Sequence, residues 1–383
     1  MIKNILFIER YLEPTNGGIE RVTYILAEEL RTRGYGTYYA FMGTESDTPL
    51  IDDSRKLCMA GCESAQELAE ALTAFIRAND IQLMMCQDYF IKKLRIAYPD
   101  IVAATGVKLV SCLHLSPDFF EKRRAFSWYF RKDYIRDVRH RITYSILGNR
   151  RVRRMRIMYA MSDRFLLLSD RYIPVFARIT GIKDTTRLIG MGNPCTFPEA
   201  EASPEREKEV LVVGRMLEFQ KRISLVLKAW RPLAAQHPDW RLRLVGDGPD
   251  LEYYRQLARE LGLKDVTFEG HSDDVSRYYP RAKIFMMTSL YEGLPMTMIE
   301  AQSFGCVPVA FDSFAALHDI IDGDNGIIVP DGDMRGLVAA VGSLMNDEDK
   351  LRRMAANAME SSRRKFARDR IIDRWCELFD SLG

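Results

Sequence analysis

Residues 209–230 read EVLVVGRMLEFQKRISLVLKAW, and this stretch decides the fold class. The apolar run over 209–214 predicts a buried strand, and apolar residues between 223 and 230 recur at the spacing of one helical face. The amino terminus repeats the order, with a strand over 4–9, a loop that ends in Gly17-Gly18, and an amphipathic helix. Two strand–loop–helix openings in one chain indicate two similar domains.

Further short apolar runs alternate with helical periods along the chain. They are residues 81–86, 107–113, 241–245, 265–268, 282–288, 306–311 and 326–329. Continuous apolar strands separated by helices are typical of parallel sheets that are covered on both faces. The loop-rich stretch over 190–208 separates the two units. We therefore predict an α/β protein with two Rossmann-like domains over 1–195 and 196–365, and a ligand site at the carboxyl ends of the strands, in the cleft between the domains.

The composition excludes several classes of protein. The chain has 383 residues, 47% of them hydrophobic and 28% charged, which is a globular balance. A net charge of +2 does not indicate a nucleic-acid binder. The apolar runs are too short for a spanning helix, and the amino terminus lacks the pattern of a signal peptide. Seven scattered cysteines without a second pair at zinc-ligand spacing favour a reducing, cytoplasmic compartment and predict no structural metal.

The most informative segment for function is 289–305, SLYEGLPMTMIEAQSFG. With Pro295 as the first residue of a helix, the amides of Met296, Thr297 and Met298 would be unpaired donors that suit a phosphate. Glu300 would lie further along the helix, where a carboxylate suits the hydroxyls of a ribose. The residues alone also permit a plain helix start that carries two surface glutamates.

A second set of residues follows the strand over 209–214. Arg215 leaves the end of the strand and Lys221 is expected to open the next helix, so the two cations can converge on a diphosphate. The alternative is a pair of solvated charges on a loop. Gly17 and Gly18 permit close approach of a ligand to the backbone, or simply form a turn.

Together these motifs resemble glycosyltransferase family 4, the retaining group with the GT-B fold, and in particular its bacterial surface-polysaccharide and lipopolysaccharide enzymes. The resemblance is carried by GGIERVTYILAEEL, by the Gly-Arg…Lys block, by VGDGPDLEYYRQLARELGLKDVTFEG and by YEGLPMTMIEAQSFGCVPVA. It is near-continuous over 209–345 and patchier over 1–115. It implies that the last helix, about 366–383, packs back on the first domain.

The resemblance also implies roles for single residues. Arg215 and Lys221 would bind the donor diphosphate, Glu300 the ribose, and Glu292 with Gly293 and Leu294 the transferred sugar. Gly17 and Gly18 would lie near the diphosphate or the acceptor, and Pro295, Met296 and Thr297 would form the phosphate-binding helix start. His114 matches a histidine that contacts the donor sugar near the reacting carbon, and this role is favoured over the alternative, a histidine that closes a core strand. The family usually has glycine where this chain has Arg222, a departure that could crowd the loop.

The implied chemistry is transfer with retention of anomeric configuration, with Glu292, His114, Arg215 and Lys221 as the catalytic set. No second carboxylate is placed to attack carbon, so we expect front-face displacement in which the departing diphosphate helps to deprotonate the acceptor. No metal or other cofactor is expected. The two Asp-Gly-Asp sequences at 322–324 and 331–333 are interpreted as turns.

A basic, aromatic stretch over 121–156 holds thirteen Lys and Arg residues against three acidic ones. A solvated helix face and nucleic-acid binding are two interpretations, but attachment to anionic lipid fits the interleaved aromatic residues best. The expected membrane or acceptor contacts are Lys122, Arg123, Arg124, Trp128, Arg131 and Lys132.

These observations predict a cytoplasmic enzyme, peripheral on the inner face of the cytoplasmic membrane. It would move a hexose-type sugar from a UDP- or GDP-linked donor to a lipid-linked or glycan acceptor, with no nucleic-acid partner. A phosphorylase or epimerase of the same fold, and a non-catalytic lipid- or nucleic-acid-binding protein, are the alternatives.

Overall fold

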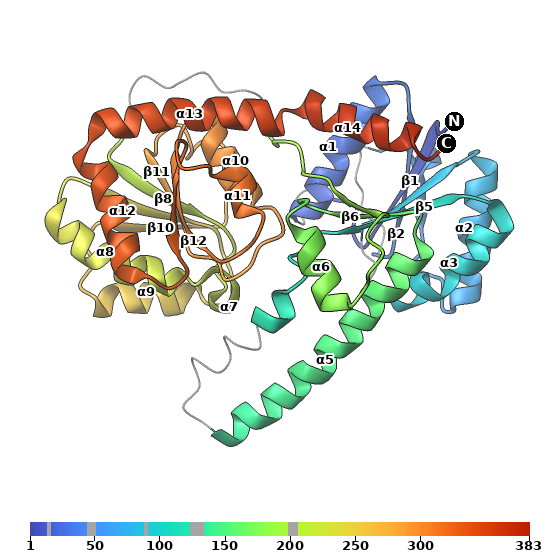
Figure 1. Cartoon of the computed structure of the whole chain (residues 1–383), viewed down its shortest axis with the longest axis horizontal. Coiled ribbons are helices and arrows are strands. Elements are labelled where there is room, and N and C mark those ends of the chain that lie inside the picture. Colours follow the sequence, from blue (N-terminus) through green and yellow to red (C-terminus); the bar gives the residue numbers. More distant parts are fainter. Residues whose placement is uncertain (14–16, 44–50, 88–90, 123–133, 198–205) are drawn as a thin grey trace. The chain divides into compact units, whose positions relative to one another are not determined.

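A computed structural model describes residues 1–13, 17–43, 51–87, 91–122, 134–197 and 206–383, and for residues 134–146 it describes the backbone only. The described chain forms two compact units, each built on one parallel sheet (Figure 1). The first unit comprises Met1–Asp118, Ile142–Thr196 and Arg368–Gly383, and the second comprises Phe119–Arg141 and Phe197–Ala367.

The sheet of the first unit has the strand order β3-β2-β1-β4-β5-β6-β7. Its strands are β1 (Asn4–Glu9), β2 (Gly36–Phe41), β3 (Lys56–Cys58), β4 (Leu83–Cys86), β5 (Lys108–Leu113), β6 (Arg164–Leu167) and β7 (Leu188–Gly190). Its helices are α1 (Gly18–Thr32), α2 (Ala65–Ala78), α3 (Lys92–Thr105), α5 (Tyr134–Met161, from Ile142 onward), α6 (Tyr172–Thr180) and α14 (Arg368–Asp380), with a 3-10 turn at Asp53–Arg55.

The sheet of the second unit has the order β10-β9-β8-β11-β12-β13. Its strands are β8 (Glu209–Val213), β9 (Arg241–Val245), β10 (Val266–Gly270), β11 (Ile284–Met287), β12 (Val307–Asp312) and β13 (Ile327–Pro330). Its helices are α7 (Glu218–Lys221), α8 (Ile223–Gln236), α9 (Leu251–Glu260), α10 (Met296–Ser303), α11 (Leu317–Ile320), α12 (Met334–Asn346) and α13 (Glu348–Phe366).

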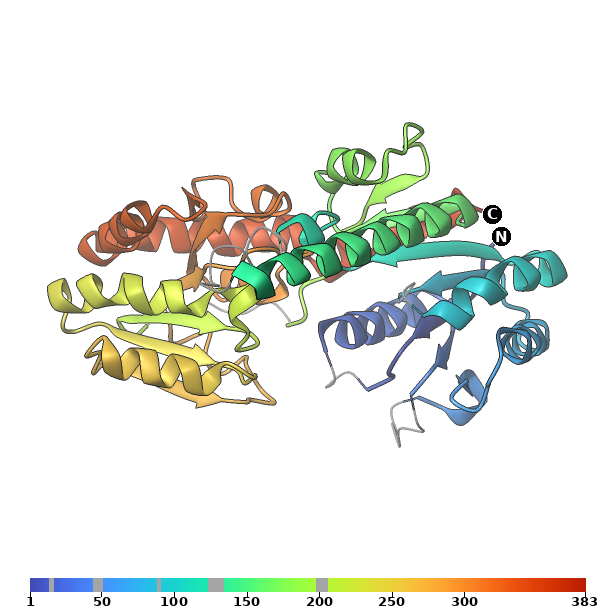
Figure 2. The same cartoon turned by 90° about the horizontal axis from the view of Figure 1, so that it is seen from below.

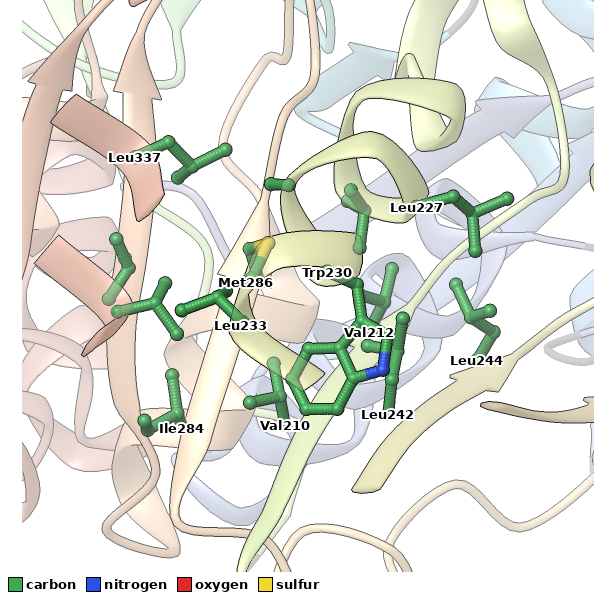
Figure 3. Close-up of a cluster of buried hydrophobic side chains, with 14 of the residues drawn as sticks. Val210, Val212, Leu227, Trp230, Leu233, Leu242, Leu244, Ile284, Met286 and Leu337 are labelled. Carbon is green, nitrogen blue, oxygen red and sulfur yellow. The ribbon is translucent and has the colours of Figure 1, made fainter. Parts of the chain in front are cut away.

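Successive side chains along each strand point to opposite faces of the sheet, and helices bury both faces. In the second unit Val210, Val212, Ile284 and Met286 share one face, on which the fully buried Trp230 of α8 lies together with residues of α9 and α12 (Figure 3). The residues between them point to the opposite face, where α10 packs with α13. This arrangement explains why the strands read as continuous apolar runs rather than as alternating ones.

In the first unit, α1 and α14 lie on one side of the sheet, and α2 and α3 pack side by side on the other (Figures 1 and 2). Leu26 and Leu30 of α1 share a core with Ile371, Trp375 and further residues of α14. The amino terminus donates a hydrogen bond to the carbonyl of Gly383, 3.2 Å away. The helix Arg368–Asp380 therefore completes the first unit, although the stretch before it, Phe197–Ala367, belongs to the second.

The fold class predicted from the sequence is confirmed, since two Rossmann-like parallel sheets are present. Four strands were not anticipated, namely β2, β3, β6 and β7. Gly36–Phe41 contains glycine and alanine among its tyrosines, and β3 and β7 have three residues each, so these three present no apolar run that stands out. The short apolar run of β6 was overlooked.

The compact units also differ from the predicted bounds, because Phe119–Arg141 groups with the second unit. Two contacts hold the described start of this segment there. Phe119 lies 5.8 Å from the ring of Tyr291, and the ammonium of Lys122 donates to the carbonyl of Ser313.

Candidate active site

The strand order of the second unit reverses between β8 and β11, where open parallel sheets bind their ligands. Lys221 comes from the segment after β8 and Glu292 from the segment after β11. Their side chains form an ion pair, with the ammonium nitrogen 2.7 Å from Glu292 Oε1, and are only 16% and 10% exposed. The fold thus joins two predicted catalytic residues that are 71 positions apart in the sequence.

The loop that carries Arg215 is fixed by backbone contacts at the ends of β8 and β9. The amide of Gly214 donates to the carbonyl of Val245 at 3.0 Å, and the amide of Met216 donates to the carbonyl of Asp247 at 2.9 Å. Arg215 itself is exposed and makes no hydrogen bond or ion pair with the described residues. An exposed guanidinium on a rigid loop is available to an anionic ligand.

Gly214 leaves room for Lys221. A Cβ atom at Gly214 would lie 3.3 Å from Cε of Lys221, so the aliphatic part of the lysine passes directly over this glycine. Gly214 and Lys221, seven residues later, are therefore parts of one local structure.

The start of α10 differs from the prediction. Pro295 precedes the helix as its cap, and the first helical residue is Met296. The amide of Met298 is not unpaired, because it donates to the carbonyl of Pro295 at 3.0 Å. The amides of Met296 and Thr297 lie ahead of the first intrahelical bonds, as first-turn amides do, so the anion site expected here has two candidate donors instead of three. Gly293 and Leu294 lie in the turn just before them.

Glu300 is almost fully buried, with 3% of its surface exposed. Its Oε2 atom accepts a hydrogen bond from the hydroxyl of Tyr279 at 2.6 Å, and Tyr279 stacks on Phe304. Sequence reasoning did not single out Tyr279, because it lies 21 residues before Glu300 and outside any motif. Its ring and hydroxyl orient the carboxylate that was predicted to bind the ribose.

His114 follows β5 at the carboxyl edge of the first sheet. Its Nε2 atom lies 2.6 Å from Oε1 of the buried Gln87, which follows the neighbouring strand β4. A carboxamide oxygen only accepts, so Nε2 carries the proton and Nδ1 presents a lone pair. Burial lowers the pKa of His114 from 6.5 to about 4, so the ring is neutral at physiological pH.

Gly17 caps α1 in an extended conformation, and Gly18 begins the helix. A Cβ atom at Gly17 would lie 2.7 Å from the carboxylate of Glu20, so this carboxylate lies against Gly17. Nearby, Glu9 ends β1 in full burial, and burial together with the charge of Glu20 raises its pKa well above 4.5. Sequence reasoning missed Glu9, because it reads as the end of an apolar strand.

Lys221 was expected to open a helix, but it closes the short helix α7 instead. The next residue, Arg222, has a left-handed backbone with φ of 49° and separates α7 from α8. The chain turns here because Arg222 leaves the helical region, which allows α8 to start in a new direction.

Of the residues predicted to face a membrane or acceptor, Lys122 is described and is half-buried against Ser313. The other five, Arg123, Arg124, Trp128, Arg131 and Lys132, lie outside the described residues. In the described part of α5, Met155 and Met158 are buried while Arg150 and Arg153 face solvent.

Within the described ranges no three His, Cys, Asp or Glu side chains group as metal ligands would, and Asp331 instead pairs with Arg222. No helix of this part of the chain combines the length and apolar character needed to cross a bilayer.

Comparison with known families identifies the class of the second unit. Residues 196–361 match the family described as Glycosyl transferases group 1. The chain therefore contains a group 1 glycosyltransferase domain, and Lys221, Glu292 and Glu300 all lie within it.

Individual relatives extend the similarity. An uncharacterized glycosyltransferase of Haemophilus influenzae is 24% identical over 366 residues, which cover 94% of this chain and 95% of that protein. An exopolysaccharide phosphotransferase of Streptomyces coelicolor is 36% identical over 177 residues, which cover 45% of this chain but only 19% of that protein.

Solved structures confirm the GT-B fold. The structure of HepE from Anabaena in complex with UDP matches with a TM-score of 0.75 and 17% identity, covering 99% of this chain and all of that one. The apo lipopolysaccharide outer core galactosyltransferase WaaB matches with a TM-score of 0.73 and 17% identity over the same shares.

Proposed function

We propose that this protein is a retaining glycosyltransferase of family 4 that acts in bacterial polysaccharide or lipopolysaccharide biosynthesis. It transfers a hexose-type sugar from a UDP- or GDP-linked donor to a lipid-linked or envelope glycan acceptor. The observation that carries the proposal is the buried Lys221–Glu292 pair at the β8–β11 reversal, beside the exposed Arg215.

The charges at this edge suit a nucleoside diphosphate. Arg215 has no protein partner in the described chain and can give two parallel hydrogen bonds to phosphate oxygens. Lys221 has three donors, of which Glu292 occupies one. Glu292 is a carboxylate, which suits sugar hydroxyls as an acceptor, and Glu300 is proposed to hold the ribose.

The proposed reaction is a front-face substitution. The bond from the anomeric carbon to the diphosphate oxygen breaks, and the bond to the acceptor oxygen forms on the same side. The acceptor proton passes to the departing diphosphate, whose charge Arg215 and Lys221 stabilise. His114 keeps the role inferred from the resemblance, contact with the donor sugar through a neutral ring. No metal is needed for this sequence of steps.

The acceptor is proposed to be held at an anionic membrane surface, with the protein peripheral on the cytoplasmic face. The support is the basic and aromatic composition of residues 121–156 together with the names of relatives, since one acts on lipopolysaccharide and another on exopolysaccharide.

The test uses UDP, GDP and ADP in thermal unfolding, without added metal, on wild type, Arg215→Ala and Arg241→Ala. Arg241 is a matched control, because it is an exposed arginine at the opposite, amino-terminal edge of the same sheet. One nucleotide at 100 times its dissociation constant should stabilise wild type and Arg241→Ala by about 2.7 kcal/mol, and Arg215→Ala far less.

Turnover of the corresponding nucleotide sugar then tests the reaction. Proton NMR of the product should show the anomeric configuration of the donor, and Glu292→Ala should lower kcat about 10²- to 10³-fold. Folded wild-type protein that binds none of the three nucleotides, or an inverted product, would contradict the proposal.

A further inference from the structure

Arg222 has a conformation that its residue type disfavours. Its φ of 49° lies in the left-handed region, and Asp80 is the other non-glycine residue with positive φ in the described chain. Arginine rarely adopts this conformation because its Cβ crowds the following carbonyl, whereas glycine adopts it freely. The side chain of Arg222 makes contacts that a glycine at this position could not make.

The side chain of Arg222 is 7% exposed, and its contacts are made by the guanidinium. Nε donates to the carbonyl of Thr288 at 2.6 Å, and Nη2 donates to the carbonyl of Ser289 at 3.0 Å and to Asp331 Oδ1 at 2.6 Å. The guanidinium also lies 5.5 Å from the ring centre of Phe311. We call Arg222, Thr288, Ser289 and Asp331 the Arg222 network.

The network joins two backbone segments in both directions. The hydroxyl of Thr288 donates back to the carbonyls of Lys221 and Arg222, at 2.9 Å and 3.0 Å. The amide of Leu290 donates to the carbonyl of Gln220 at 2.7 Å. The segment that carries Lys221 is thus bonded to the segment that leads into Glu292 immediately beside their ion pair.

A planar guanidinium is required for this arrangement. The N–H groups of the guanidinium point in fixed directions at three acceptors, two carbonyls in the segment after β11 and a carboxylate after β13. The single ammonium of a lysine cannot reproduce these directions. Asp331 begins the turn after β13, so the network also connects the reversal point to the far strand of the sheet.

We propose that Arg222 is a positioning residue, which holds Lys221 opposite Glu292 in the geometry that binds the donor diphosphate and sugar. Arg222 does so through its bonds to Thr288, Ser289 and Asp331 and does not touch the donor. As far as the ligand is concerned, this inference rests on the proposed function.

The first test compares Arg222→Gly and Arg222→Lys with Arg206→Gly. Arg206 is a matched control in the same unit, because its guanidinium also donates to two backbone carbonyls, those of Ala282 and Phe304, but before β11 and after α10. We expect both Arg222 variants to bind the nucleotide about 10- to 100-fold more weakly, because Lys221 would be displaced from its contact position. Arg206→Gly should bind the nucleotide as wild type does. Circular dichroism establishes that each variant is folded.

A double-mutant cycle separates positioning from general damage. If Arg222 acts through Lys221, then Arg222→Gly should weaken binding less than about twofold in a Lys221→Ala background, because the group that it positions is gone. If the two substitutions together weaken nucleotide binding by the product of their separate effects, the inference is overturned. It is also overturned if Arg222→Gly leaves nucleotide affinity and kcat/KM unchanged.

A readout without ligand distinguishes this inference from the proposed function. Labelling of Lys221 by an amine-reactive ester, followed by peptide mass spectrometry, should be faster in Arg222→Gly than in wild type or Arg206→Gly. Unchanged labelling overturns the positioning role. If labelling is faster in Arg222→Gly but wild type binds no nucleoside diphosphate, the proposed function and the ligand assignment are overturned. In that case the result still supports the placement of Lys221 by Arg222.

Discussion

At the scale of single residues, burial decides which candidate groups carry a charge. His114 lies at a strand end with a lowered pKa because an imidazolium would be poorly solvated there. The side chains of Lys221 and Glu292 are largely removed from solvent, and their opposite charges compensate each other there. The first unit thus presents the neutral imidazole of His114 at the end of a strand. The second unit presents Lys221, paired with Glu292, and the exposed Arg215.

The lowered pKa of His114 predicts a pH dependence of stability. Unfolded His114 titrates near 6.5 and the folded form near 4, so the unfolded state binds more protons between these values. The free energy of unfolding should therefore fall as the pH drops from about 6.5 to 4, with His114 contributing up to about 3 kcal/mol.

Urea unfolding of wild type and His114→Gln between pH 7 and pH 4 measures this contribution. The substituted protein should lose less stability over the interval, whereas His271→Gln, which alters a side chain that is 71% exposed, should behave as wild type does. Identical acid sensitivity of wild type and His114→Gln would contradict a neutral, buried His114.

At the scale of secondary-structure elements, the site depends on how strands end. The loops after β8 and β9 lie backbone to backbone, and this contact excludes side chains. Gly246 has φ of 132°, and a Cβ atom there would lie 2.1 Å from the carbonyl oxygen of Gly214. The loop that presents Arg215 can keep its place only if residue 246 is glycine.

Gly246→Ala should therefore displace the Arg215 loop and weaken nucleotide binding about 100-fold, the effect of a misplacement near 1 Å. Gly262→Ala is the matched control, since Gly262 also has positive φ, 70°, but no atom lies within 4 Å of its Cβ position. Titration calorimetry should show wild-type affinity for Gly262→Ala. Equal affinities of the two variants would show that the loop contact does not set the site.

At the scale of the whole molecule, the chain closes the first unit with its last helix. Trp375 and Phe379 of α14 pack in the same core as β1 and β2, whereas the rest of the chain after Thr196, up to Ala367, builds the second unit. Each unit thus has its own apolar core, and the second is centred on the fully buried Trp230 (Figure 3).

Separate cores predict separate responses to core truncation. Trp375→Ala should destabilise the first unit and Trp230→Ala the second, each by about 3–5 kcal/mol. Proteolysis at increasing urea concentration, with fragments assigned by mass spectrometry, should show earlier cleavage within the affected unit only. Earlier cleavage in both units of both variants would mean that the molecule unfolds as one body.

Local patterns in the sequence determined the two parallel sheets, most of their long buried strands, and the residues gathered at the β8–β11 reversal. These features are legible because a strand buried on both faces must be apolar throughout, and because the ends of such strands meet at one edge. Of the four missed strands, β2 contains small residues and β3 and β7 have three residues each, so the identity of these three comes from the neighbours with which they pair.

Only the tertiary structure decided which partners these residues have. The bond from Tyr279 to Glu300, the contact of half-buried His114 with Gln87 and the contacts of Arg222 with Thr288, Ser289 and Asp331 join positions 21 to 109 residues apart. No local pattern encodes such contacts, because they arise when separate elements pack and leave buried donors that must find acceptors. For the same reason the sequence does not reveal that Arg222, a departure at a glycine position, makes these contacts beside the Lys221–Glu292 ion pair.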